Sequence, residues 1–193
     1  MTRIVTVLTE GFADWEIALL NAVAKGFYGM ETSFASPGGR PVTSMGGMRV
    51  APELAVEALD PATFDALVVY GGAAWKRTDA PDISDIARRT HAAGKLVAGI
   101  CDGTFALAKT GLLDGIAHTS NGVGYLDETG YSGKGLYRDG PEAVTDRRIV
   151  TAPGTSPVSF MAAVMAGLGA ADDRLRYYVG LHAAQFSGLQ QAA

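Results

Sequence analysis

Short strand-like runs, most of them almost wholly apolar, alternate along the chain with segments whose apolar residues recur at helical spacing. The runs predict strands at residues 3–9, 31–36, 65–70, 96–100 and 148–152. The intervening patterns predict helices at residues 14–25, 81–93, 102–110, 158–167 and 171–185. Continuously apolar strands that alternate with helices are typical of a mostly parallel sheet covered by helices on both faces.

Two segments interrupt this alternation with the pattern of a β-hairpin. Residues 41–50 are broken by Gly46-Gly47, and residues 142–152 are broken by Asp146-Arg147. The chain has 193 residues and no internal repeat, a length that suits one hydrophobic core. We therefore expect a single domain over residues 1–193.

Composition and charge narrow the classes of partner. Hydrophobic residues make up 48% of the chain, so it can bury a substantial core. The net charge is −4 and the basic residues are scattered, which argues against a nucleic-acid or anionic-membrane surface and favours a small-molecule partner. No apolar run has the length of a membrane span, and the N-terminus lacks the pattern of a signal peptide, so we expect a cytoplasmic protein.

Cys101 is the only cysteine, and it lies where the predicted strand 96–100 meets the predicted helix 102–110. A sharp strand-to-helix turn exposes one side chain at the carboxyl edge of a sheet, beside the free N–H groups of the helix. Those N–H groups and the helix dipole favour a thiolate. The alternative is a small buried cysteine with no chemical role.

Glu16 is the strongest candidate for an acidic partner. It lies one turn into the first predicted helix between Trp15 and Ile17, so it is expected to face inward. A protonated carboxyl beside Cys101 would donate a hydrogen bond to the thiolate and lower the thiol pKa. The alternative is that acidic residues here only complement the helix dipole.

The Gly71-Gly72 pair follows the predicted strand 65–70 and therefore lies at the same sheet edge. The N–H groups of Gly72 and Asp102 would form an oxyanion hole for charge that develops on a bound carbonyl. The pair could equally serve only a tight turn. Trp75 either walls the pocket or belongs to the core.

A catalytic base is harder to identify. His118 is the only histidine with a suitable place in the sequence, because His91 falls inside a helix and His182 lies far along the last one. A cysteine hydrolase usually needs a histidine within hydrogen-bond reach of the sulfur. His118 and Asn121 are both candidates to contact substrate, although in an extended segment they would face opposite sides.

Five segments, in this order, resemble those of the ThiJ/PfpI family of the class I glutamine amidotransferase-like superfamily. They are Gly11-Phe12-Ala13-Asp14-Trp15-Glu16, Tyr70-Gly71-Gly72, Gly99-Ile100-Cys101-Asp102-Gly103, Gly111-Leu112-Leu113-Asp114-Gly115 and Val150-Thr151-Ala152-Pro153-Gly154-Thr155-Ser156. The resemblance implies a flavodoxin-like three-layer α/β sandwich, usually dimeric, with a reactive cysteine at Cys101 and an acid at Glu16. We expect a homodimer with no cofactor and no bound metal.

Two departures from the family pattern limit the chemistry. Asn121 occupies a position where many members carry histidine, and Asp102 follows the cysteine where PfpI-type proteases carry histidine. An acid at that position would raise the thiol pKa. The His-x-Glu pair of glutamine amidotransferases is absent, because Ala183-Ala184 follow His182.

Three functional hypotheses remain open. The first is a small cysteine-dependent hydrolase or hydratase that acts on a carbonyl, amide or isonitrile carbon. The second is a non-enzymatic sensor of oxidative stress that uses reversible oxidation of Cys101. The third is a structural homologue without catalytic activity.

Overall fold

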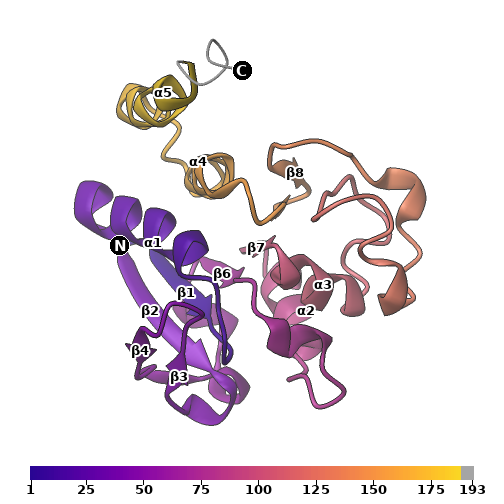
Figure 1. Cartoon of the computed structure of the whole chain (residues 1–193). Coiled ribbons are helices and arrows are strands. Elements are labelled where there is room, and N and C mark those ends of the chain that lie inside the picture. The colour runs from indigo at the N-terminus through magenta and orange to yellow at the C-terminus, as the bar shows by residue number, and fades with distance from the viewer. Residues whose placement is uncertain (188–193) are drawn as a thin grey trace.

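A seven-stranded sheet in the order β5-β2-β1-β6-β7-β9-β8 runs through the protein (Figure 1). The computed structural model describes residues 1–187. The strands are β1 (Arg3–Val7), β2 (Glu31–Ser36), β5 (Leu54–Ala55), β6 (Ala66–Val69), β7 (Leu96–Ile100), β8 (Val144–Asp146) and β9 (Ile149–Ala152). All neighbouring strands are parallel except β8 and β9, which confirms the mostly parallel sheet that the apolar runs predict.

Helices cover both faces of this sheet. They are α1 (Asp14–Ala22), α2 (Ser84–Ala92), α3 (Asp102–Lys109), α4 (Pro157–Gly167) and α5 (Asp173–Ser187). Helices α1 and α4 pack against each other on one face, with α5 outside α4, whereas α2 and α3 lie on the other face (Figure 1). The fold is thus the expected flavodoxin-like sandwich. Within residues 1–187, no helix is both long enough and apolar enough to cross a membrane.

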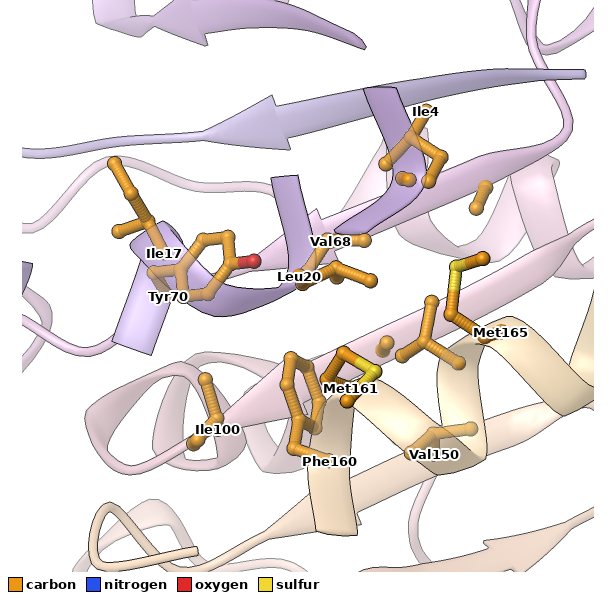
Figure 2. Packing of buried hydrophobic residues seen from close by; sticks show 14 of the residues in the cluster. Ile4, Ile17, Leu20, Val68, Tyr70, Ile100, Val150, Phe160, Met161 and Met165 are labelled. Atoms are coloured by element: carbon orange, nitrogen blue, oxygen red, sulfur yellow. The ribbon is translucent and has the colours of Figure 1, made fainter. Parts of the chain in front are cut away.

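The alternation of side chains along each strand builds two separate cores. Ile4 and Val68 point to the face covered by α1 and α4, where they join Phe160 in one buried cluster (Figure 2). The residues next to them in sequence, Val5 and Leu67, belong to a second cluster under α2 and α3. Because successive strand residues face opposite sides, continuously apolar strands supply both clusters at once.

Most element boundaries differ from the predicted ones by a few residues. The first helix changes at Val23 from α-helical to π-helical geometry, which continues to Phe27. Both hairpins are present, the first formed by β3 (Val42–Thr43) and β4 (Arg49–Val50) and the second by β8 and β9. Short 3-10 helices span Pro37–Gly39, Val56–Ala58, Pro61–Thr63, Ala73–Lys76, Asp127–Thr129 and Lys134–Leu136.

Two local features were not predicted. Strand β5 is only two residues long and pairs with the edge of β2, so it leaves little periodicity in the sequence. Ser156 lies at the start of α4, but its hydroxyl donates to the Pro141 carbonyl instead of capping the helix. This contact joins α4 to the segment before β8.

Close packing of α3 on β6 predicts that Gly103 cannot be replaced by alanine. A Cβ at Gly103 would lie 2.1 Å from the Val69 carbonyl oxygen, so the helix would have to move. We expect Gly103→Ala to lower the free energy of unfolding by about 3 kcal/mol or more, as overpacked cores do. The measurement is urea denaturation.

Gly180 in α5 is the control, because a Cβ there meets nothing within 4 Å. Gly180→Ala is expected to raise the free energy of unfolding by about 0.5–1 kcal/mol through helix propensity. Equal effects of the two substitutions would contradict the packing argument.

Candidate functional site

Cys101 lies at the turn between β7 and α3 in a backbone conformation that L-residues rarely adopt. Its φ is 56° and its ψ is −128°. The Cys101 N–H donates to the Ala152 carbonyl at 3.0 Å, which ties the turn to the end of β9. The Thr104 hydroxyl donates to the Cys101 carbonyl at 2.6 Å. A positive φ that the surrounding structure holds in place is typical of a nucleophile elbow.

Two glycines allow the thiol and a buried carboxyl to approach each other. A Cβ at Gly71 would lie 2.7 Å from Cys101 Cβ and 2.8 Å from Glu16 Oε2. A Cβ at Gly154 would lie 2.8 Å from Cys101 Sγ and 3.1 Å from Glu16 Oε1. Any larger residue at either position would therefore displace the thiol or the carboxyl.

Glu16 is fully buried and faces inward from the first turn of α1, as its position between Trp15 and Ile17 predicts. Its Oε2 accepts a hydrogen bond of 2.8 Å from the Gly71 N–H. Its Oε1 has no hydrogen-bond partner among residues 1–187. Burial raises the pKa of Glu16 to about 7, and the Gly71 N–H only partly opposes this effect. A substantial fraction of the carboxyl therefore holds a proton near neutral pH.

Asn121 contacts the sulfur directly. Its Nδ2 donates to Cys101 Sγ at 3.3 Å, and its Oδ1 accepts a hydrogen bond of 2.8 Å from the Gly154 N–H. The Gly154 N–H can only donate, so it fixes which end of the amide faces the thiol. Asn121 thus fills the place beside the sulfur that the family resemblance assigns to histidine, as a donor that does not titrate.

Opposing effects act on the Cys101 thiol, and their net result is a raised pKa. Burial raises the pKa of the thiol to about 12, and the negative charge of Glu16 adds to this increase. Hydrogen bonds from Asn121 and from the Asp102 N–H act in the opposite direction. The Asp102 carboxylate also raises the thiol pKa, as the sequence predicts, while accepting a hydrogen bond from the Tyr125 hydroxyl. Two negative charges on Cys101 and Glu16 together are therefore disfavoured.

The half-buried thiol opens into a largely apolar pocket of about 510 Å³. The pocket is lined by Trp15, Cys101, Asn121, Pro153, Gly154, Thr155 and Pro157. No histidine is among these described lining residues.

Trp75 and His118 do not line this pocket, which corrects their assignment as substrate-binding candidates. Trp75 is 1% exposed, and its indole N–H donates to the Tyr70 carbonyl at 2.8 Å, so it is a core residue. His118 is 0% exposed, and its ring nitrogens lie 2.9 Å from the Ile116 carbonyl and 3.3 Å from the Tyr131 hydroxyl. Satisfied polar contacts in the core explain both positions.

Gly72 is displaced from the thiol by one residue. A Cβ at Gly72 would meet Thr9, at 2.9 Å, and Phe12, and the glycine packed against Cys101 is Gly71. The Gly72 N–H as an oxyanion donor stays a prediction. The sequence-based reasoning missed Gly154, although Gly154 follows β9 at the carboxyl edge beside β7. The rule that pointed to Gly71-Gly72 applies equally to that turn.

These observations define an α/β protein with a cysteine at a nucleophile elbow, a buried carboxyl beside it and an apolar pocket in front of it. The DJ-1/PfpI family model matches residues 2–167, so the chain belongs to the DJ-1/PfpI family. The crystal structure of the DJ-1 superfamily protein Atu0886 from Agrobacterium tumefaciens superposes with a TM-score of 0.91. It is 42% identical, and the match covers 96% of this chain and 99% of that one.

Two relatives carry names that refer to an activity. The uncharacterized protease YoaZ of Bacillus subtilis is 31% identical over 147 residues, which is 75% of this chain and 70% of that protein. A deglycase of Pyrococcus abyssi is 39% identical over 80 residues, which is 41% of this chain and 48% of that protein. Both names fit a hydrolase-like family.

The contact between Asn121 and Cys101 predicts that the amide promotes thiolate formation. We expect Asn121→Ala to slow alkylation of Cys101 by iodoacetamide about tenfold at pH 7, because one hydrogen bond to a charged group is lost. Asn121→Asp should slow it further, because a carboxylate would then face the sulfur. Mass spectrometry of the alkylated protein measures the rates, and circular dichroism controls for folding. Unchanged rates in both variants would contradict this role.

Proposed function

We propose that the protein is a cysteine-dependent hydrolase or hydratase that acts on a carbonyl, amide or isonitrile carbon of a small molecule. The observation that carries this proposal is the buried carboxyl of Glu16, whose unpartnered Oε1 shares a glycine-walled space with the half-buried thiol of Cys101. A thiol and an acid placed together supply a nucleophile and a proton donor.

A single proton is shared between these two groups over a wide range of pH. Since two negative charges are disfavoured, the pair carries one proton and one negative charge above about pH 7. The sulfur has two N–H donors, from Asn121 and Asp102, whereas Glu16 Oε1 has none among the described residues. These donors stabilise the tautomer in which the sulfur carries the negative charge and Oε1 the proton, and we propose that this tautomer is the reactive one.

In this tautomer Glu16 can supply the proton that the addition step requires, so the step needs no histidine. With a carbonyl or amide, the Cys101 thiolate forms a bond to the carbon, the π electrons move onto the oxygen, and the proton of Glu16 neutralises the charge that develops. With an isonitrile, the proton goes to the carbon that the sulfur attacks. Water then adds to the carbon of the resulting C=N bond, its protons go to the nitrogen and to the carboxylate of Glu16, and the C–S bond breaks to release the thiolate and a formamide. With an amide, the C–N bond would have to break and the amine leave with a proton before water could add. N–H groups at the start of α3, and the Gly72 N–H, are the proposed donors to an oxyanion.

No histidine is among the described residues that line the pocket, so we consider peptide-bond hydrolysis less favoured than hydration. Amide cleavage has to protonate an amine leaving group, and cysteine proteases use a neighbouring histidine for that step. Hydration of an electrophilic carbon has no such leaving group. It therefore suits a site built from Cys101, Glu16 and Asn121.

A redox sensor is the second candidate function. The two N–H donors around Sγ and the carboxyl of Glu16 would hydrogen-bond the oxygen of a sulfenic or sulfinic acid. The oxidant would be a peroxide, each equivalent of which transfers one oxygen atom to the sulfur and leaves as water or an alcohol, so the sulfenic acid takes one equivalent and the sulfinic acid two. Tight glycine walls at Gly71 and Gly154 leave little room for further oxidation on that side.

Alkylation rates measured against pH test the shared proton. We expect the alkylation rate of wild-type Cys101 to rise through an apparent pKa near 7, because the pair loses its first proton there and the sulfur then carries part of the charge. Glu16→Gln should remove this step, because the amide has no proton to lose, and should leave the thiol alone with a pKa that burial raises. Glu16→Leu should slow alkylation at pH 7.5 by about tenfold or more, because the O–H donor to the sulfur is lost.

One alkylation result would contradict this proposal. An ionised Glu16 that only repels the thiolate would make both neutral variants faster than the wild type at pH 7.5. That result would contradict the proposed proton on Oε1. Denaturation curves of the two variants serve as the control for folding.

Turnover assays test the enzymatic proposal itself. We expect the wild type to convert at least one of methylglyoxal, an alkyl isonitrile and a simple amide, and Cys101→Ala to fall to the background rate. Glu16→Gln should lower kcat about a hundredfold or more, because the amide has no proton to transfer. Equal background rates for wild type and Cys101→Ala on all three substrates would contradict an enzyme.

Peroxide titration then separates the second candidate from an inactive homologue. A sensor should gain oxygen at Cys101 before any of its six methionines is oxidised, as read by intact mass and peptide mapping. Methionine oxidation first would contradict the sensor.

A further inference from the structure

An apolar groove of about 700 Å³ lies between α1, α4 and α5 on the surface next to the thiol pocket. Ala18 and Leu19 contribute from α1, Val158 from α4, and Val179 and Phe186 from α5. None of the described residues that line the groove is an aspartate, glutamate, lysine or arginine. His182 and Gln185 are polar members of the lining, but most of the surface is apolar and suits a neutral apolar group.

The groove and the thiol pocket are neighbours that share three lining residues. Trp15, Thr155 and Pro157 line both. The Trp15 indole N–H donates to the Gly154 carbonyl at 3.0 Å, although the side chain is 51% exposed. This hydrogen bond holds the ring at the boundary between the two cavities, where one face can serve each of them.

We infer that the substrate of Cys101 carries an apolar alkyl or aryl group that extends from the thiol pocket across Trp15 into the groove between α1, α4 and α5. This inference rests on the proposed function, because it assigns the substrate class of the same site. The reacting carbon would lie at the sulfur and the apolar group would lie against α1. Small hydrophilic compounds would reach the thiol without using the groove.

Alkylation with a series of N-alkyl iodoacetamides tests the groove without relying on turnover. In each reagent the sulfur displaces iodide at the same carbon, and only the length of the N-alkyl chain changes. We expect the second-order rate constant of Cys101 to rise about two- to fourfold for each added methylene from methyl to hexyl, since each buried methylene strengthens binding by about that factor. Glutathione, measured in parallel, should show no such rise.

Two neighbouring alanines of α5 provide a matched pair of variants. Ala183 lines the groove, whereas Ala184 does not, and both are exposed. Ala183→Asp should abolish most of the gain with chain length, because it places a charge in the apolar groove. Ala184→Asp adds the same charge and should keep the gain. Ala184→Asp should also react with the N-methyl reagent at the wild-type rate, and denaturation curves of both variants control for folding.

Three other results of these alkylation experiments would overturn the inference. A wild-type rate independent of chain length, or an equal loss in both variants, overturns the inference. A gain that disappears as protein concentration rises, together with dimer formation in sedimentation, would assign the groove to a second copy of the chain and also overturn it. Turnover of small substrates without any effect of chain length would overturn this inference while leaving the proposed function intact.

Discussion

The close approach of four backbone segments around one side chain is the constraint on which the site depends. Cys101 adopts a positive φ because α3 begins immediately after β7, and α3 can begin there only because Gly103 packs against the Val69 carbonyl. Gly71 and Gly154 then close in from the neighbouring strand ends. Each contact is possible only without a Cβ, so glycines at three positions determine where the sulfur lies. The elbow is therefore a property of the sheet edge as a whole.

Burial of Glu16 follows from the same geometry and has an electrostatic consequence. The first turn of α1 packs so closely over the sheet edge that water is excluded from the carboxyl, and a single backbone N–H, from Gly71, reaches it. One hydrogen bond does not repay the loss of hydration of a carboxylate, so the pKa of Glu16 rises to about 7. The protein thus places a carboxyl that is partly protonated at neutral pH next to a thiol. Apolar packing, more than any charged partner, creates this pair.

The sequence allowed the fold to be predicted in large part, and the reason is physical. Apolar strands buried on both faces and amphipathic helices have clear periodicities, which give the order of elements even where boundaries move by a few residues. Strand β5 was not predicted, because a strand of two residues is too short to show a periodicity. The cysteine and the acid could be placed because the carboxyl ends of β7 and β1 lie at the same edge of a parallel sheet, whereas Asn121 was singled out by the family resemblance.

The positions of Trp75 and His118 could not be predicted by the same reasoning. Both follow segments that lead to the sheet edge, yet both turn into the core, because a carbonyl or hydroxyl there satisfies the polar atom of each ring. Sequence spacing gives the distance along the chain but not the direction of a side chain in an irregular segment. Gly154 was missed because the rule for the carboxyl ends of strands was applied after β6 and β7 but not after β9, which pairs with β7.

Asn121 connects these features to the chemistry. A histidine beside the sulfur could hold the proton that the thiol releases, and the acid would then be free to ionise. Asn121 donates a hydrogen bond but cannot take up a proton, so the proton is left to Cys101 and Glu16. A carboxyl that accepted several hydrogen bonds would ionise fully and could not share it. The one hydrogen bond that Glu16 accepts among the described residues and the amide at Asn121 are therefore complementary, and under the proposed function they suit an addition reaction better than cleavage of a peptide bond.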